Sequence, residues 1–104
     1  MIIDEEIAAS LVPVLVEFGA EWCPPCKALA PVLEAVAAEY RDRLRILTVD
    51  ADAEPALTAR FNVVSLPTLL LFRDGELAGR LVGARGKGRL TQELEELLSV
   101  VAPS

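Results

Sequence analysis

The chain has 104 residues, of which 53% are hydrophobic, with a net charge of −6 and an isoelectric point near 4.6. This length allows one domain with a sizeable core, spanning residues 1–104, and is too short for two. The negative charge argues against binding to nucleic acid or to anionic membranes, and because the acidic residues are dispersed, we expect them to form a solvated surface.

The N-terminal residues lack the basic segment and cleavable apolar run of a secretory signal peptide. The apolar segment Leu11–Val16 is far shorter than the roughly 20 residues needed to span a membrane. We therefore expect a cytoplasmic protein with no membrane association.

A strand and a long helix are predicted in the first half of the chain. Val14–Phe18 is apolar except for Glu17, which is typical of a buried central strand. From Lys27 to Tyr40, apolar residues recur at helical spacing, which predicts a helix with one apolar face. Pro31 lies inside this helix and is expected to kink it.

The second half predicts two helices and three strands. Leu44–Val49 is rich in strand-forming residues, and residues 55–61 predict a short helix that begins at a proline. Thr68–Phe72 and Leu77–Val82 predict two strands joined by a hairpin turn. A final helix has its apolar face on residues between Leu90 and Val101.

This order of elements predicts an α/β fold. The first two strands are separated by a helix, which favours a parallel crossover, whereas the hairpin adds antiparallel strands. The expected result is a mixed sheet covered by helices on both faces.

The two cysteines, Cys23 and Cys26, lie three residues apart where the first strand gives way to the first long helix. The dipole and unpaired N–H groups of a helix N-terminus lower the pKa of the first thiol, and a thiolate is the species that attacks disulfides. The chain has no histidine, so cysteine–histidine dyads and histidine metal ligands are excluded, and two cysteines alone cannot complete a zinc site. The pattern therefore predicts thiol–disulfide exchange.

Pro24 and Pro25 separate the cysteines and carry no backbone N–H. The N–H of Cys26 is then the nearest backbone donor to the Cys23 sulfur. Fewer donors stabilise the Cys23 thiolate less, which favours a more reducing cysteine pair. The prolines also stiffen the turn, and this stiffening could change the reduction potential in either direction. The sign of the net change in reduction potential stays open.

Glu17 is the one charged residue in the first predicted strand. Its apolar neighbours leave little room for a solvent-facing side, so we expect the carboxyl to be buried. A buried carboxylate without a cation has a raised pKa and is able to accept a proton from the thiol of Cys26.

The chain resembles the thioredoxin family over about residues 11–100. The strongest matching segments are Val16–Lys27 and Leu66–Phe72, and weaker ones are Ala30–Leu33 and Val82–Ala84. The resemblance implies a thioredoxin fold, with a mixed sheet of about four strands and a shortened N-terminus.

The resemblance also implies roles for individual residues. Cys23 would be the exposed attacking thiolate, and Cys26, more buried, would resolve the mixed disulfide. Pro67 matches the family's cis-proline, which faces the two sulfurs. The implied substrate-docking surface consists of Trp22, Pro24, Pro25, Leu66, Pro67, Gly83 and Ala84.

The chain departs from the family pattern at four positions near the cysteines. It has Pro24 where glycine is usual, Glu17 where aspartate is usual, and Gly19 where an aromatic residue is usual. Thr48 replaces a lysine, which should raise the pKa of Glu17 further.

The first strand of the family is mostly missing, so Leu44–Val49 is expected to become a sheet edge. An edge strand invites pairing with another chain, but Arg43 and Arg45 discourage this. We expect a monomer, with dimerisation through this edge as the alternative. Lys27, Lys87 and the arginines are expected at the solvated surface.

The leading functional prediction is a protein disulfide reductase that passes electrons to protein disulfides. The resemblance implies a flavoprotein of the thioredoxin reductase type as its electron donor. No bound cofactor or metal is expected, because the cysteine pair carries the two electrons. The alternatives are a disulfide oxidase or isomerase, and a non-catalytic adaptor with the same fold.

Overall fold

The computed structural model describes residues 3–99. In chain order, its elements are α1 (Ile3–Ala9), β1 (Val14–Gly19), α2 (Pro24–Tyr40), the 3-10 helix η1 (Arg41–Arg43), β2 (Arg45–Asp50), α3 (Pro55–Arg60), β3 (Thr68–Arg73), β4 (Glu76–Val82) and α4 (Lys87–Ser99).

All four predicted strands are confirmed, with ends within one residue of those expected. Helix α2 starts at Pro24, three residues earlier than predicted, because prolines fit the first helical turn, where N–H groups have no helical partner. It continues through Pro31 to Tyr40 as one helix. Val101, expected on the last helix, lies outside the described residues.

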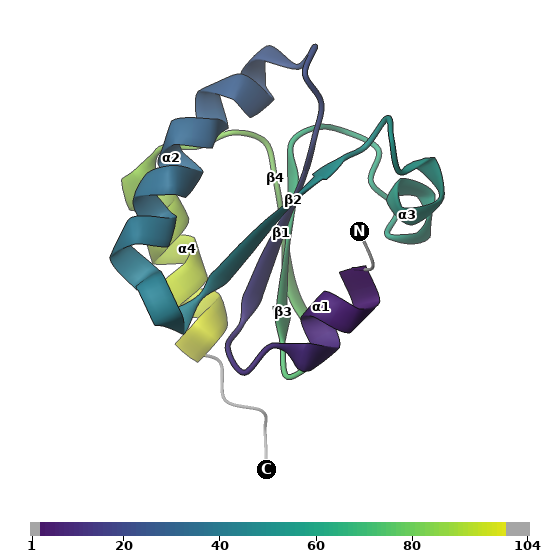
Figure 1. Cartoon of the computed structure of the whole chain (residues 1–104). Coiled ribbons are helices and arrows are strands. Elements are labelled where there is room, and N and C mark those ends of the chain that lie inside the picture. Colours follow the sequence, from purple (N-terminus) through teal and green to yellow (C-terminus); the bar gives the residue numbers. More distant parts are fainter. Residues whose placement is uncertain (1–2, 100–104) are drawn as a thin grey trace.

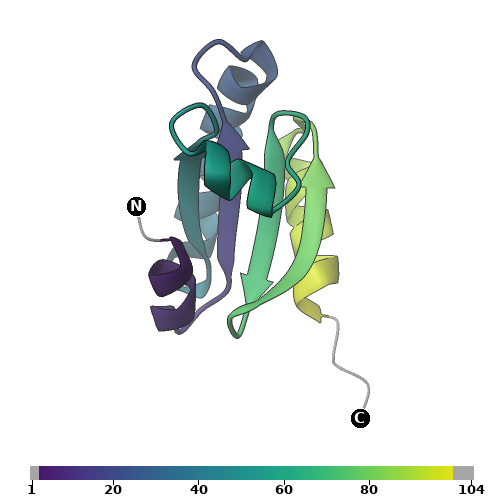
Figure 2. The ribbon, with the colours of Figure 1, turned by 90° about the vertical axis from the view of Figure 1, so that its right-hand side faces the viewer.

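The four strands form one mixed sheet in the order β2-β1-β3-β4. Strands β1 and β2 are parallel, whereas β1–β3 and β3–β4 are antiparallel. The strand predicted as Leu44–Val49 is β2, and it lies at the edge of the sheet, as expected (Figure 2). The hairpin turns at Asp74 and Gly75, both with positive φ, which is typical of a two-residue turn.

Helices cover both faces of the sheet, with α2 and α4 on one side and α1 and α3 on the other (Figure 1). Side chains alternate along β1, so Leu15 packs into the core beneath α2 and α4 while Val16 and Phe18 pack toward α1 and α3. Glu17 has the same parity as Leu15 and therefore faces α2.

Helix α1 was not predicted, and in the described part of the chain no strand precedes β1. Its apolar residues Ile3 and Ile7 are four apart and both lie buried in the core. Asp4 at its start forms a two-bond ion pair with Arg60 of α3. The helix is thereby held by both packing and charge.

Candidate active site at the start of helix α2

Cys23 and Cys26 form a disulfide at the N-terminus of α2, with Cα atoms 5.3 Å apart. Cys23 is the N-cap residue, and its Sγ accepts a hydrogen bond from the N–H of Cys26 at 3.3 Å. Pro24 and Pro25 occupy the first helical positions and offer no N–H. The expectation that Cys26 supplies the nearest backbone donor is confirmed.

The expected difference in exposure between the two cysteines is wrong for this disulfide form. Cys23 is 3% exposed and Cys26 is 7% exposed, so both are buried and Cys23 is not the more open. The reason lies in the capping geometry, which turns the Cys23 side chain back onto the first turn of α2.

Glu17 lies beneath Cys26, as the alternation along β1 requires. A Cβ built on Gly19 would lie 3.2 Å from the Glu17 Oε2 and 3.4 Å from the Cys26 Sγ. The carboxyl and the sulfur therefore border the same small volume, which Gly19 leaves free of any side chain.

The surroundings of Glu17 make its carboxyl a weaker acid than an exposed glutamate. The residue is 7% exposed, and burial raises the pKa of its carboxyl above the ordinary value of 4.5. Within residues 3–99, no hydrogen bond or ion pair to this carboxyl is present. The predicted direction of the shift in the pKa of Glu17 is confirmed.

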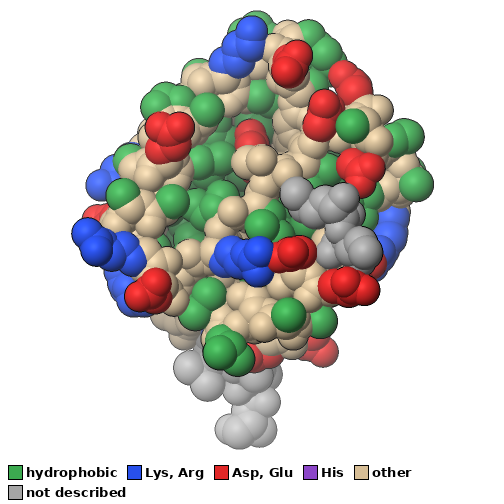
Figure 3. Space-filling model, in the orientation of Figure 1, with side chains coloured by type: hydrophobic (Ala, Val, Ile, Leu, Met, Phe, Trp, Pro, Cys, Tyr) green, Lys and Arg blue, Asp and Glu red, His purple; other side chains and the backbone are tan. Residues whose placement is uncertain are grey.

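A hollow of about 370 Å³ leads from solvent to Glu17 and Cys26. Figure 3 shows the hollowed face beside the sheet, with an acidic side chain recessed among hydrophobic ones. Gly19 and Thr48, two of the positions that depart from the family pattern, both line the hollow. Small side chains at these positions keep the route to the carboxyl open.

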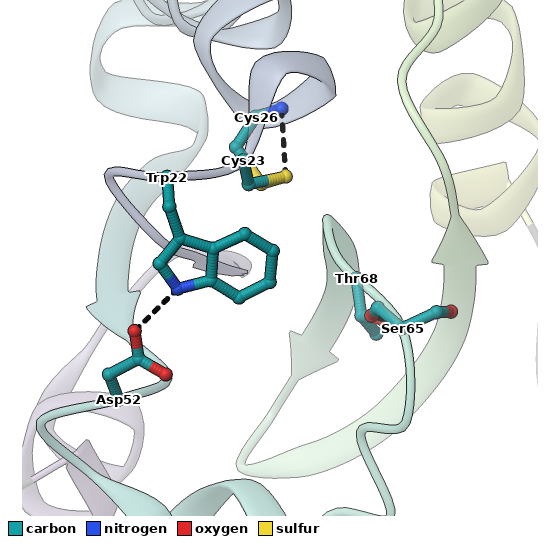
Figure 4. The surroundings of a disulfide bond; sticks show 6 residues. All are labelled: Trp22, Cys23, Cys26, Asp52, Ser65 and Thr68. Atoms are coloured by element: carbon teal, nitrogen blue, oxygen red, sulfur yellow. Dashed lines mark hydrogen bonds between the residues drawn. A yellow bond between two sulfur atoms is a disulfide. The ribbon is translucent and has the colours of Figure 1, made fainter.

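The Leu66–Pro67 peptide bond is cis, as the resemblance implied. Phe18 in β1 pairs with Thr68 in β3, which brings the segment before Thr68 to the end of the sheet where Cys23 lies. In Figure 4, Ser65 in the loop before β3 and Thr68 at the start of β3 lie across from the disulfide. The elements expected around the sulfurs are therefore gathered at one end of the sheet.

The implied docking residues surround this end of the sheet with varied exposure. Trp22 is 66% exposed, Pro24, Pro25 and Ala84 are exposed, Leu66 and Gly83 are partly buried, and Pro67 is buried. The surface thus offers apolar area from Trp22 and the prolines, whereas Pro67 contributes mainly through its backbone.

Trp22 is held by a contact that the sequence did not predict. Its indole Nε1 donates a hydrogen bond to the Asp52 Oδ2 at 2.6 Å (Figure 4). Asp52 follows β2 and is 30 residues away in the chain, and no motif in the sequence joins the two. Val64 and Val82 are further exposed apolar residues, and neither was predicted from the sequence to belong to the docking surface.

The described residues include no group of three or more acidic, cysteine or histidine side chains placed to hold a metal ion. Between residues 3 and 99, no helix is long and apolar enough to cross a membrane.

Comparison with known proteins identifies the family. Residues 3–96 match the Thioredoxin family model. The thioredoxin of Mycolicibacterium smegmatis is 50% identical over 95 residues, a match covering 89% of this chain and 85% of that protein. The thioredoxin of Mycobacterium bovis is 46% identical over 93 residues, covering 89% of this chain and 80% of that protein.

A third relative carries two activities in its name. It is the bifunctional thioredoxin reductase/thioredoxin of Mycobacterium leprae, 44% identical over 93 residues that cover 89% of this chain and 20% of that protein. The matched residues span most of this chain and include the cysteine pair at the start of α2. The chain therefore belongs to the thioredoxin family and is a protein disulfide oxidoreductase with a redox-active cysteine pair.

Proposed function

We propose that this protein is a reductase of protein disulfides, with Cys23 as the nucleophile and Cys26 as the resolving thiol. The observation that carries this assignment is the N-cap position of Cys23, where the Cys26 N–H points at its sulfur. The same N–H and the positive end of the α2 dipole stabilise a thiolate at Cys23 once the disulfide is reduced.

The reaction begins when the Cys23 thiolate attacks one sulfur of a substrate disulfide. A bond forms between the Cys23 Sγ and that sulfur, and the other substrate sulfur leaves as a thiolate. The substrate is then covalently attached to Cys23. Trp22, Pro24, Pro25, Leu66, Gly83 and Ala84 form the surface against which the substrate docks.

The second step releases the substrate. Glu17, as a carboxylate, takes the proton of the Cys26 thiol, and the resulting thiolate attacks the Cys23 Sγ. The Cys23–Cys26 disulfide forms, and the second substrate sulfur leaves as a thiolate. Two electrons have moved from the cysteine pair to the substrate.

Regeneration of the dithiol needs an external electron donor. We infer a flavoprotein reductase, and the Mycobacterium leprae relative, named as both thioredoxin reductase and thioredoxin, supports this inference. The cysteine pair itself carries the electrons, so the cycle requires no cofactor bound to this chain. A cytoplasmic location fits, because a disulfide reductase needs a compartment kept at low thiol potential.

We propose that the protein acts as a monomer. The edge strand β2 is the surface most open to pairing with a second chain. Arg45 on this strand forms an ion pair with Glu6 of α1, which sets charged side chains along the edge. Sedimentation of the oxidised and reduced protein at several concentrations tests this assignment.

The equilibrium reduction potential of the cysteine pair tests the direction of the reaction. Trp22 is the only tryptophan in the chain and adjoins Cys23, so its fluorescence should report the redox state in a dithiothreitol series. A midpoint of about −270 mV or lower is expected for a reductase. A midpoint of about −180 mV or higher would indicate an oxidase or isomerase instead. A protein with no reversible transition would be the non-catalytic adaptor.

A further inference from the structure

Arg85 was expected at the solvated surface, and this expectation is wrong. Its side chain is 3% exposed, although it follows directly on the exposed Ala84. Burial of the guanidinium is compensated by four oxygen atoms, two from one carboxylate and two from backbone carbonyls. The Nη1 group forms an ion pair with Glu93 of α4 and lies 2.6 Å from each of the two carboxylate oxygens.

The other donors of Arg85 hold backbone carbonyls of the preceding loop. Nη2 donates to the carbonyl oxygen of Val82 at 2.6 Å, and Nε donates to that of Gly83 at 3.2 Å. A planar guanidinium presents its donors in a fixed fork, so the two carbonyls are held in a set orientation relative to α4.

The same loop is fixed from its opposite side. The N–H of Gly83 donates to the carbonyl oxygen of Pro67 at 2.9 Å. Gly83 has a φ of +96°, a backbone conformation that glycine adopts readily. Its peptide groups are therefore held between the cis-proline segment before β3 and the buried guanidinium of Arg85, which is itself paired with Glu93 of α4.

We propose that Arg85 is a positioning residue that fixes the segment Val82–Ala84 for an extended stretch of a protein disulfide substrate. This proposal rests on the proposed function, in which that segment docks substrate beside Cys23. Because Arg85 engages the two carbonyls, they are not free to rotate toward solvent. The segment is thereby ordered before substrate arrives, which lowers the entropic cost of docking.

The burial of Arg85 argues for a specific role. A buried charge is costly unless it is paired and fully hydrogen-bonded, and here the pair with Glu93 meets this requirement. Removing the guanidinium would leave the carbonyls of Val82 and Gly83 without this donor. A nearby arginine provides the contrast: Arg89 reaches the same Glu93 at 3.4 Å, yet its side chain is 68% exposed.

The test compares Arg85→Met with Arg89→Met on the full chain. Each variant is assayed with insulin as the protein disulfide and with dithiobis-nitrobenzoate as the small disulfide. For Arg85→Met, we expect KM for insulin to rise about five- to tenfold, with kcat and small-disulfide reduction unchanged. Arg89→Met should match the wild type, because it loses a charge near Glu93 but no contact to the loop.

Two results would overturn the assignment. One is an unchanged KM for insulin in a folded Arg85→Met protein. The other is an equal loss with both disulfides, which would place the damage at the cysteine pair. Glu93→Gln tests the ion pair separately from the loop contacts. This variant should be less stable than the wild type, because Arg85 loses its charged partner. Its KM for insulin should stay within about twofold of the wild-type value, because Arg85 still holds both carbonyls.

Amide hydrogen exchange gives a readout that does not depend on activity. In Arg85→Met, the N–H of Gly83 should exchange about tenfold faster, because one anchor of its loop is lost. Wild type that fails to reduce insulin would refute the proposed function, yet the exchange rate would still decide whether Arg85 orders the loop. Should Arg85→Met not fold, Arg85→Met with Glu93→Leu removes both charges together and is measured in the same way.

Discussion

Glu17 and Thr48 stand directly opposite each other in the parallel ladder between β1 and β2. Both residues line the hollow that leads to Cys26. A lysine in place of Thr48 would set an ammonium group beside the carboxyl, whereas threonine supplies no charge. The burial of Glu17 is therefore not offset by a cation at this position, and the pKa of its carboxyl is raised.

Replacing Thr48 with lysine should reverse this effect. A cation beside Glu17 favours the carboxylate, so the pKa of Glu17 should fall. The pH dependence of mixed-disulfide resolution should then shift to lower pH, as measured by stopped-flow release of substrate from Cys23. Thr48→Gln introduces a long side chain like that of lysine but without its charge, so this control should keep the pH profile of the wild type. Identical profiles for the two variants would contradict the argument.

Glu17→Gln removes the proposed proton acceptor while keeping the shape of the side chain. Resolution of the mixed disulfide by Cys26 should slow about 100-fold, while the first attack by Cys23 keeps its rate. Rapid-quench trapping of the mixed disulfide separates the two steps. Glu21→Gln is the matched control, because Glu21 lines the same hollow but is exposed. Resolution at the wild-type rate would remove Glu17 from the mechanism.

The raised pKa of Glu17 also predicts how stability depends on pH. Between 4.5, the ordinary value, and the higher folded-state value, the folded protein holds a proton that the unfolded chain has lost. The free energy of unfolding should therefore fall as pH rises through this window and remain lower above it. Glu17→Gln should lack this fall. Urea titrations of both oxidised proteins at several pH values check the difference, and parallel curves would count against it.

Gly19→Ala tests whether the free volume beside Glu17 matters. The added methyl would lie 3.2 Å from the Glu17 Oε2 and 3.4 Å from the Cys26 Sγ, so the carboxyl must shift. Further desolvation should raise the pKa of Glu17 and slow resolution by about two- to fivefold at neutral pH. Gly86→Ala is the control, since its new methyl would meet nothing within 4 Å. Equal rates for the two variants would show that the volume is not used.

Much of the site follows from local patterns in the sequence. The alternation along β1 places Glu17 on the face toward α2, and the prolines between the cysteines leave Cys26 as the backbone donor. Both relationships depend on residues close in the chain. The cis bond before Pro67, in contrast, was expected only from the resemblance, because few X–Pro bonds are cis.

The features that were missed depend on contacts between distant residues. Helix α1 has two buried apolar residues in seven, too few for its periodicity to stand out, and it forms against a core built from other strands. The bond from Trp22 to Asp52 joins the loops after β1 and β2. Arg85 lies in a loop that reads as surface in the sequence, and its burial depends on a contact with Glu93, eight residues further along in α4.

The position of β2 at the sheet edge has a practical consequence for engineering. Among the described strands, β2 has a neighbour on one side only, and Thr48 and Asp50, which border the hollow beside Glu17, lie on it. A tethered strand grafted along this edge would place a reporter group next to the resolving cysteine without altering β1 or β3. The open edge of β2 thus becomes an attachment point for building a redox sensor.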